Sequence, residues 1–464
     1  MLKYTELFEC LRSDIEAGRL KSGERLPSIR SLVQARPYSK NTVLKALGEL
    51  EAGGYIEPKA RQGYFVCFNL KTGKEKLVEP GQLEAAEVSL PSIFHTIMAK
   101  GAAFDLTPGA EDKLIPSQLI ELNRALGRAQ KRAVGDKAMY YDAPAGDLIL
   151  KQQLRARYKL RDLHLDENDI CITSGCQNAL FLALSVSCRP GDTVAVESPC
   201  FYGVLQLLEQ LRLHIVEIPS SPKTGMELSQ LALALQKFRI EACVVTPNFS
   251  TPTGALMPDD NKRTLIKLAN EHSLTLIEDD IYGELSFGQE VKSLAGFDTQ
   301  DRVILCSSFS KTLSRDLRVG WVISRRWHEA LVRLKLSTQL ASSKSSQQAI
   351  ADFIRGGYYR RHLLQFKRSL IVQRNQLLAA LEEYWPNSLA YHIPQGGLAL
   401  WLELPEQVDT NELYVKFLQQ GIILTPGSLF SSQDRFRHCL RVSFNQPVVG
   451  ERLAALKKLG QFFQ

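Results

Sequence analysis

Side chains with distinct chemistry follow five strand-like runs in the middle of this 464-residue chain. Lys311 stands out among them, because it lies among hydroxyl groups in "SSFSKTLSRDLRVGW", directly after the apolar run "RVILC". The other runs are followed by a glycine before a helix, by aromatic rings, by a polar turn and by a carboxylate with a phenol. In chain order the residues are Gly175, Cys176 and Gln177, then Phe201, Thr251, Asp279 and Tyr282, and finally Ser308, Ser310, Lys311 and Arg318.

Together these side chains match the chemical groups of one cofactor. A glycine between a strand and a helix leaves backbone N–H groups available to bind an anion such as phosphate. Aromatic residues suit a flat pyridine ring, a carboxylate suits its nitrogen, a hydroxyl or phenol suits its phenolic oxygen, and a lysine amine suits an aldehyde. The set predicts a site for pyridoxal phosphate, and we expect no metal ion.

The elements that must position these residues alternate along the second, larger part of the chain. Short and nearly continuous apolar runs, such as "CITS", "VAVES", "CVVTP" and "VILC", are separated by helix-length segments. This alternation is typical of the α/β class with a doubly wound, mostly parallel central sheet. In such sheets ligands bind beyond the carboxyl ends of the strands, which is where the residues named above lie.

The stretch "SFSKTLSRDLRVGW" resembles the pattern "SFSKxxxPGLRxGW" of fold-type I aminotransferases, and the resemblance extends over roughly residues 104–464. It implies a PLP-dependent transferase domain with a smaller C-terminal α+β subdomain. It also implies that Lys311 forms a Schiff base with the cofactor. Ser308, Ser310 and Arg318 would hold the phosphate, because a guanidinium forms forked hydrogen bonds that a lysine amine does not.

Further positions match the same family. Asp279 corresponds to the aspartate that keeps the pyridine nitrogen protonated, and Tyr282 to a tyrosine that hydrogen-bonds the phenolic oxygen. Asp280 is interpreted as a turn or helix cap. Phe201 occupies the place of the stacking aromatic residue, and Tyr202 is the alternative.

One position departs from the family. The usual turn reads "NPTG" and its asparagine bonds the phenolic oxygen, whereas this chain has Thr251 in "STPTG". A hydroxyl makes one such bond, with a shorter reach and a different geometry. The departure puts efficient catalysis in question.

Two more residues complete the expected site. Tyr141, in "YYDAPAGDLILKQQL", matches a tyrosine that reaches the phosphate of the partner subunit, and Tyr140 is the alternative. Arg441, in "CLRVSFN", matches the arginine that grips the α-carboxylate of the substrate with two parallel hydrogen bonds. The resemblance thus implies a homodimer and an amino acid or amine as ligand.

The N-terminal part of the chain has a different character. Between Arg19 and Lys45 there are seven basic residues and one acidic residue, Glu24, which is the charge pattern of a phosphate-facing surface. Apolar residues at helical spacing predict three helices, of which the second and third begin at Ser28 and Ser39. The run "YIEPKARQGYFVCF" predicts two short strands around a turn that contains Lys59, Arg61 and Gly63. Three helices and a basic hairpin predict a winged helix-turn-helix.

This N-terminal part resembles the GntR superfamily of bacterial regulators in "GRLKSGERLPSIRSL" and "SKNTVLKALGELEAGGYIEPKARQGYFV". The segment "ARPYSKNT" departs from the usual turn before the recognition helix. The resemblance implies binding to double-stranded DNA, with polar side chains of a helix in the major groove. The residues implicated are Arg25, Arg30, Lys40, Asn41, Thr42, Lys45 and Gly63.

The order of the two parts predicts three segments. Residues 1–68 form the DNA-binding domain, residues 69–92 a charged linker, and residues 93–464 an aminotransferase-like domain that binds pyridoxal phosphate and an effector and that dimerises. This combination resembles the MocR group, which implies a transcriptional regulator that senses an amino compound, or the cofactor itself, as an aldimine at Lys311. The alternatives are an active aminotransferase, which transfers an amino group between an amino acid and a 2-oxo acid, and a DNA-binding protein whose large domain only dimerises.

Composition predicts a reducing environment. The nine cysteines form no CxxC pair, which argues against a disulfide framework and a thiolate zinc site. The first residues, "MLKYTELFECLRSDIEAG", carry charges throughout and lack the apolar core of a signal peptide. We expect a cytoplasmic protein without a membrane segment.

Overall fold

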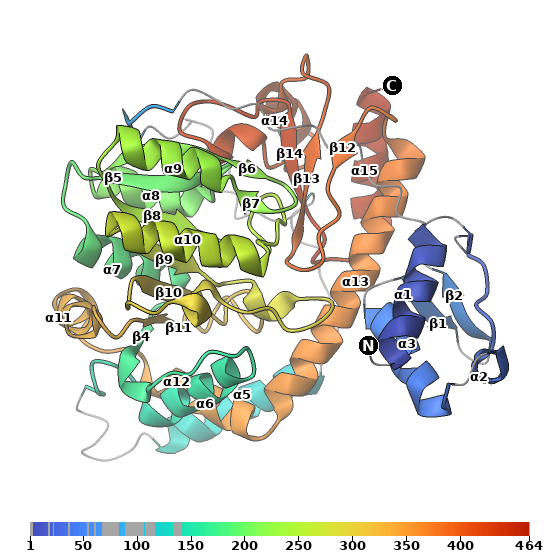
Figure 1. Cartoon of the computed structure of the whole chain (residues 1–464), viewed down its shortest axis with the longest axis horizontal. Helices are drawn as coiled ribbons and strands as arrows, with labels where there is room; N and C mark the ends of the chain where they lie inside the picture. The colour runs from blue at the N-terminus through green and yellow to red at the C-terminus, as the bar shows by residue number, and fades with distance from the viewer. Residues whose placement is uncertain are drawn as a thin grey trace.

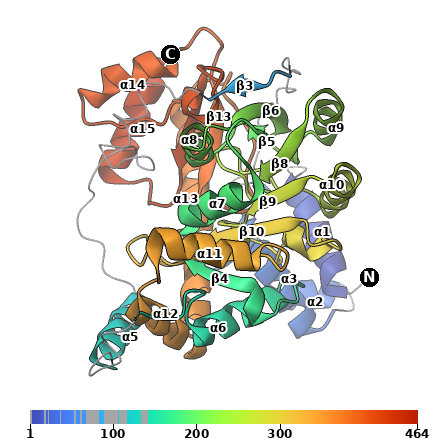
Figure 2. The same ribbon diagram turned by 90° about the vertical axis from the view of Figure 1, so that its left-hand side faces the viewer.

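The structure is a computed structural model of the chain, shown in Figure 1 and, turned by 90°, in Figure 2. It describes residues 3–16, 19–21, 23–35, 38–52, 55–59, 62–66, 83–88, 106, 117–132 and 141–463. A small N-terminal unit, called the head from here on and spanning residues 3–66, lies beside the long helix α13 (Tyr358–Tyr384) of a larger unit (Figure 1).

The head contains the expected three helices and a hairpin: α1 (Lys3–Glu16), α2 (Ile29–Ala35), α3 (Lys40–Ala52), β1 (Ile56–Lys59) and β2 (Gly63–Val66). Both expected N-caps are present, because Ser28 Oγ accepts a hydrogen bond from the N–H of Ser31 and Ser39 Oγ accepts one from the N–H of Thr42, each at 3.1 Å. The helices are held together by buried side chains at helical spacing, namely Leu7, Leu11, Ile15, Val43, Leu47 and Leu50.

The hairpin differs slightly from its sequence-based outline. Lys59 and Gly63 were expected in the turn, but they pair with each other and close the antiparallel ladder of β1 and β2. Arg61, also expected in the turn, lies outside the described residues. Gly63 has a φ of +103°, a conformation that favours glycine.

The larger unit is built on a nine-stranded sheet with the order β3-β6-β5-β8-β9-β10-β11-β4, to which β7 adds at β6. Neighbours from β6 to β10 are parallel, whereas β11 is antiparallel to both β10 and β4. The expected mostly parallel sheet is therefore confirmed. The strands are β3 (Ala86–Glu87), β4 (Ile170–Thr173), β5 (Thr193–Ser198), β6 (His214–Ser221), β7 (Gly225–Met226), β8 (Ile240–Val245), β9 (Thr275–Asp279), β10 (Val303–Ser308) and β11 (Gly320–Ile323).

Helices cover both faces of this sheet (Figure 2). One face packs against α7 (Cys176–Ser187), α8 (Tyr202–Gln210) and α11 (His328–Gln339), and the other against α9 (Leu228–Lys237) and α10 (Asp259–His272). Because successive strand residues point to opposite faces, Val244 packs with the first group while Cys243 and Val245 pack with the second. Burial on both faces explains why these strands are continuous apolar runs in the sequence.

The remaining elements form the two ends of the larger unit. The C-terminal subdomain contains an antiparallel sheet of β12 (Ala390–Tyr391), β13 (Ala399–Glu403) and β14 (Cys439–Ser443), with α13, α14 (Thr410–Leu418) and α15 (Gly450–Phe462). It is the expected smaller α+β subdomain. At the other end α5 (Ser117–Arg132), α6 (Leu148–Lys159) and α12 (Lys344–Arg355) pack together.

Part of the segment expected to be a linker lies against the large sheet. Strand β3 pairs with β6, and the Lys237 amine donates a hydrogen bond to Leu83 O at 2.9 Å. Residues 69–82 and 89–92 lie outside the described residues, so the segment boundaries 1–68, 69–92 and 93–464 stay predictions. In the part of the chain that the structure describes, no helix is both long enough and apolar enough to cross a bilayer.

Candidate functional site

Lys311 follows β10 and lies among charged groups. Burial and the guanidinium groups of Arg315 and Arg441 lower the pKa of its amine to about 7, and the carboxylate of Asp279 opposes that shift. Deprotonating the amine near neutral pH produces the nucleophilic form that attacks an aldehyde. The structure therefore places Lys311, Asp279 and Arg441 within electrostatic reach of one another, as the sequence predicts.

Asp279 is the last residue of β9, and its carboxyl group is buried. Its Oδ1 accepts a hydrogen bond from the Cys176 thiol and another from the N–H of Ile281, both at 3.3 Å. Burial raises the pKa of Asp279 to about 6, although these hydrogen bonds and the positive charge of Lys311 act in the opposite direction. A protonated ring nitrogen placed beside this carboxylate would stabilise its charge.

The N terminus of α7 forms an anion cradle. Gly175, which precedes the helix, has a φ of +94°, and the Arg318 guanidinium donates a hydrogen bond to Ser174 O at 2.9 Å. A Cβ atom at position 175 would lie 2.7 Å from Nη2 of Arg318, so a side chain here would fill the space between the helix end and the guanidinium. The glycine therefore keeps backbone donors and a cation open to the same ligand.

The two serine residues lie at the same edge of the sheet as this cradle. Ser308 pairs with Gly320 on β11, and Gly320 pairs with Thr173 at the end of β4, directly before the cradle. Ser308 Oγ accepts a hydrogen bond from the N–H of Ser310 at 3.3 Å. Two hydroxyl groups thus join the donors available to a phosphate.

The two candidate stacking residues have different surroundings. Tyr202 is buried, with its ring centroid 5.8 Å from that of Phe430, whereas Phe201 is half-buried at the N terminus of α8. The Phe201 ring covers Gly203, whose carbonyl accepts a hydrogen bond from Gln177 at 2.6 Å. This position beside the start of α7 favours Phe201 as the residue that stacks on the cofactor ring, and the role stays a prediction.

Tyr282, Thr251 and Arg441 form a second group around the site. The Tyr282 hydroxyl is hydrogen-bonded to Thr251, so the threonine that replaces the usual asparagine meets the tyrosine that was expected to act with it. Burial raises the pKa of Tyr282, against the positive charge of Arg441 and the bond to Thr251. The Arg441 guanidinium carbon lies 5.3 Å from the centroid of the Phe430 ring, which forms one wall beside it.

Tyr141 is not brought to these residues within one chain. Its side chain is 79% exposed, and Tyr140 lies outside the described residues. An exposed position is compatible with the expected contact to the phosphate of a partner subunit, which stays a prediction.

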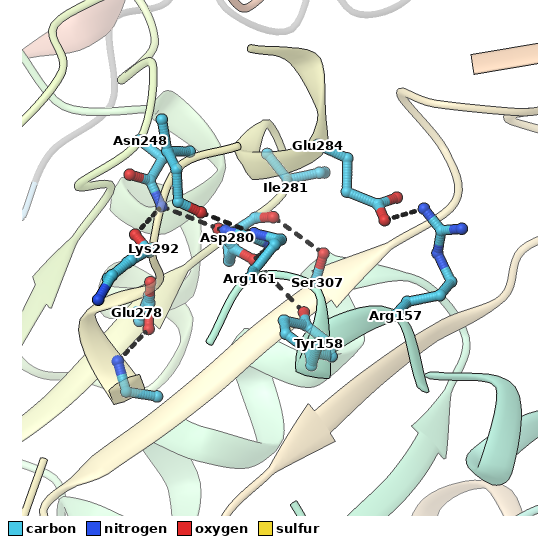
Figure 3. A network of polar contacts seen from close by, with 12 residues as sticks. Arg157, Tyr158, Arg161, Asn248, Glu278, Asp280, Ile281, Glu284, Lys292 and Ser307 are labelled. Atoms are coloured by element: carbon cyan, nitrogen blue, oxygen red, sulfur yellow. Dashed lines mark hydrogen bonds and ion pairs between the residues drawn. The ribbon is translucent and has the colours of Figure 1, made fainter. Parts of the chain in front are cut away.

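Asp280 is not the turn or helix cap that the sequence suggested. Its buried carboxylate binds the Arg161 guanidinium through two hydrogen bonds, at 2.5 and 2.8 Å, and accepts a third from the Asn248 amide at 3.2 Å (Figure 3). Arg161 and Asp280 are 119 positions apart, and no local pattern links them. Residues around the site that sequence reasoning missed are Arg157, Arg161, Glu284, Arg315 and Tyr359.

The donor set fits the predicted cofactor. A cradle that only a glycine leaves open suits the phosphate, a buried carboxylate suits the ring nitrogen, and an amine with a lowered pKa suits the aldehyde. Gly175, Ser308, Ser310 and Arg318 would hold the phosphate, while Asp279, Tyr282 and Thr251 would hold the ring.

Helix α3, the expected recognition helix, exposes three of its predicted residues, Lys40, Asn41 and Lys45. Lys40 and Asn41 are exposed in the first turn of α3. Thr42 and Lys45 also serve the head itself: the Thr42 hydroxyl lies 2.9 Å from Ser39 Oγ, and the Lys45 amine lies 3.8 Å from the centroid of the Tyr4 ring. Lys40 and Asn41 are therefore the stronger candidates for contact with bases.

The remaining basic residues flank this helix. Arg25 and Arg30 are both exposed, and a Cβ atom at Gly63 would lie 3.5 Å from Nε of Arg25, so that guanidinium covers the start of the second hairpin strand. The Arg25 backbone also forms a bridge with Phe65 on the same strand. Arg25 and Gly63 thus form one local surface at the hairpin.

The fold and the site define a fold-type I aminotransferase-like domain that carries a winged helix-turn-helix head. Residues 112–453 match the family of aminotransferase class I and II, and residues 3–66 match the bacterial regulatory proteins of the gntR family. The chain belongs to the aminotransferase class I and II family and, as a fusion with the GntR-type head, to the MocR-type transcriptional regulators. This confirms the expected family, fold class and cofactor class, pyridoxal phosphate.

Several known proteins are similar to this chain. Over 470 residues the chain is 35% identical to the uncharacterized HTH-type transcriptional regulator YjiR of Escherichia coli (strain K12), covering 99% of this chain and 98% of that protein. Another uncharacterized HTH-type regulator of that strain, YdcR, is also 35% identical over 470 residues, covering 100% and 99%. Among solved structures, the kynurenine aminotransferase of Pyrococcus horikoshii is 25% identical, with a TM-score of 0.72 over 81% of this chain and 94% of that one.

The lowered pKa of Lys311 makes cofactor uptake depend on pH. The neutral amine is the reactive form, so we expect the rate at which the cofactor-free protein takes up pyridoxal phosphate to rise as the pH increases through about 7. The measurement is stopped-flow visible absorbance between pH 5.5 and pH 9, a range chosen to bracket that pKa from both sides by roughly two units. A rate that still rises tenfold per pH unit up to pH 9, as expected for an ordinary lysine with a pKa of about 10.4, would contradict a perturbed amine.

The exposed position of Asn41 predicts a role in base recognition. Asn41→Ala should weaken binding to a DNA fragment selected by the wild-type protein by about 1–3 kcal/mol, while leaving binding to random DNA nearly unchanged. Fluorescence anisotropy at fixed salt measures both affinities, and Glu6→Ala, an exposed change on α1, is the control. Equal losses on selected and random DNA would place Asn41 on the phosphate backbone instead.

Proposed function

We propose that the protein is a transcriptional regulator in which an amino compound, bound at the Lys311 site, controls how the head binds promoter DNA. The observation that carries this proposal is the complete site around Lys311, with Asp279, Arg441 and the anion cradle, on the same chain as a GntR-type head. A domain used only for dimerisation would have no need of a buried amine whose pKa is lowered to about 7.

Each site residue would have a separate role in binding the ligand. Pyridoxal phosphate, when bound, supplies an aldehyde for condensation with a primary amine and a ring that withdraws electrons. The low pKa of Lys311 lets its amine lose a proton near neutral pH, and Tyr282 keeps its proton because burial raises its pKa. Arg441, beside the ring of Phe430, would bind a carboxylate through a forked pair of hydrogen bonds.

The head would act on DNA as one of a pair. The exposed Lys40 and Asn41 would enter the major groove, with Arg25 and Arg30 near the phosphates. In a homodimer two heads meet two half-sites, which raises the affinity through effective concentration. The 79% exposure of Tyr141 fits its proposed contact with the phosphate in the partner's site.

An active aminotransferase is the second candidate function, and one observation favours it. The hydrogen bond between Tyr282 and Thr251 supports a role for the threonine in place of the family's asparagine. The carboxylate of Asp279 and the guanidinium of Arg441 are also within electrostatic reach of Lys311. The two candidate functions use the same site. They differ in whether the bound amino compound is retained or its amino group is transferred to a 2-oxo acid.

Replacing Lys311 tests whether the response to amino compounds depends on this amine while DNA binding does not. Lys311→Ala should abolish the visible absorbance of bound cofactor and the effect of amino compounds on promoter binding, while leaving the basal affinity for DNA unchanged, because the head does not contain the residue. Absorbance and electrophoretic mobility shift measure the two properties. Lys267→Ala, which changes an exposed lysine on α10, is the matched control.

The same samples test the alternatives. If Lys311→Ala keeps its response to amino compounds, the effector does not act through this amine and the proposal is wrong. If an amino compound converts the wild-type spectrum and a 2-oxo acid reverses the conversion, the protein is a working aminotransferase. A spectral change that persists and alters promoter binding supports a sensor.

A further inference from the structure

Two arginine residues at the end of α6 face two carboxylates behind the cofactor site. Arg157 lies in the last turn of α6 and Arg161 four positions later, and they bind Glu284 and Asp280, which are also four positions apart. The charge of Glu284 also acts on Arg161, so the two pairs are neighbours, and we call them the double ion pair (Figure 3).

The Arg161–Asp280 pair is fully enclosed. The side chains of Arg161 and Asp280 are 3% and 0% exposed, and Nε of Arg161 donates a further hydrogen bond to Val291 O at 2.9 Å. A Cβ atom at Gly283 would collide with both the guanidinium and the carboxylate, so the glycine in "DIYGEL" lets the pair form. Such a pair fixes the backbone that carries it, because breaking it strands a buried charge.

The Arg157–Glu284 pair is extended by a tyrosine. The Tyr359 hydroxyl donates a hydrogen bond to Glu284 Oε2 at 2.6 Å and lies 2.8 Å from Thr312 Oγ1. The Arg157 guanidinium carbon lies 4.1 Å from the centroid of the Tyr359 ring. Burial alone would raise the pKa of Glu284, but Arg157 and the hydrogen bond from Tyr359 lower it, so the carboxylate stays charged.

Both ion pairs are linked to a residue that is adjacent in sequence to a predicted cofactor-site residue. Asp280 directly follows Asp279, and its backbone is tied to β10 by the N–H bond to Cys306 O at 2.8 Å and by the hydroxyl of Ser307, which donates to Asp280 O at 3.0 Å. Thr312 directly follows Lys311. The Asp279 carboxylate and the Lys311 amine follow from two different strands. Arg161 contacts the neighbour of Asp279 directly, and Arg157 is linked to the neighbour of Lys311 through Glu284 and Tyr359.

We propose that Arg157 and Arg161 are positioning residues that hold Asp279 and Lys311 at the separation needed to bind pyridoxal phosphate between them. The inference rests on the proposed function in requiring that the site binds this cofactor. It goes beyond that proposal because it assigns a role to residues that touch neither the cofactor nor the effector.

The test uses the full-length protein loaded with pyridoxal phosphate. Two cofactor signals are measured, and a purely structural role would change them only in step with the stability of the protein. Visible circular dichroism per bound cofactor reports how the ring is held, and the dissociation constant comes from the same band. The two variants are Arg161→Met and Tyr359→Phe, which removes only the hydroxyl that links Glu284 to Thr312. Arg155→Met, which breaks an exposed ion pair of the same helix with Glu167, is the control.

Both variants should bind the cofactor roughly 10- to 100-fold more weakly and change its circular dichroism, as expected when a site is displaced by a fraction of an ångström, while the control matches the wild type. The double variant Arg161→Met/Asp280→Asn removes the stranded charge, so it should recover the melting temperature but not the dichroism.

Two results would overturn the inference. One is a dichroism signal that follows the melting temperature through all variants, including recovery in the double variant, because the pair would then be structural only. The other is unchanged cofactor binding in Tyr359→Phe, which decides the matter even where Arg161→Met does not fold. A wild-type protein that binds no pyridoxal phosphate would overturn the proposed function as well, whereas normal wild-type binding confines the failure to the double ion pair.

Discussion

Three consecutive carboxyl side chains, Glu278, Asp279 and Asp280, are buried at the end of β9, and the site depends on how their charge is balanced. Glu278 accepts hydrogen bonds from the N–H groups of Leu294 and Ala295, at 2.7 and 2.9 Å, and burial together with the charge of Asp280 raises its pKa. Two neighbouring carboxylates without partners would be strongly unfavourable in a dry interior. Because Arg161 neutralises Asp280, the middle carboxylate can keep its charge for a ligand.

Strand geometry separates these roles. Side chains alternate along a strand, so Asp279 points toward Cys176 and α7, while its two neighbours point to the opposite side. On that side Asp280 is joined to Asn248, and Asn248 Oδ1 accepts a hydrogen bond from the buried amine of Lys262 at 2.9 Å. Lys262 in turn lines a cavity of about 670 Å³ between the large unit and the head, whose walls on the head side include Tyr4 and Phe8 of α1. The hydrogen bonds from Asp280 through Asn248 to Lys262, which lie behind the Asp279 carboxylate, therefore end at the surface that faces the head.

Local sequence patterns predicted many of the residues at the site. They missed contacts between residues that lie far apart in the sequence. Lys311, Asp279 and Gly175 were found because each lies at the carboxyl end of a strand or within three residues after it, and a parallel sheet collects such residues at one edge. The partner of Asp280 was not found, because Arg161 follows a helix 119 positions earlier and its spacing carries no signal. The same holds for Tyr359 and Thr312, whose contact joins the start of α13 to the turn after β10.

Helix α13 contacts both the turn that carries Lys311 and the cavity that faces the head. Near its start, Tyr359 and His362 contact Thr312, the neighbour of Lys311, at 2.8 and 2.9 Å. Further along, Arg374 lines the cavity that faces the head, and the separation of 15 positions between Tyr359 and Arg374 corresponds to about 22 Å of continuous helix. A ligand changes the head only through a difference in its affinity for two arrangements of the chain. One unbroken helix contacts both the turn that carries Lys311 and the wall of the cavity beside the head, so two such arrangements would have to differ along this helix.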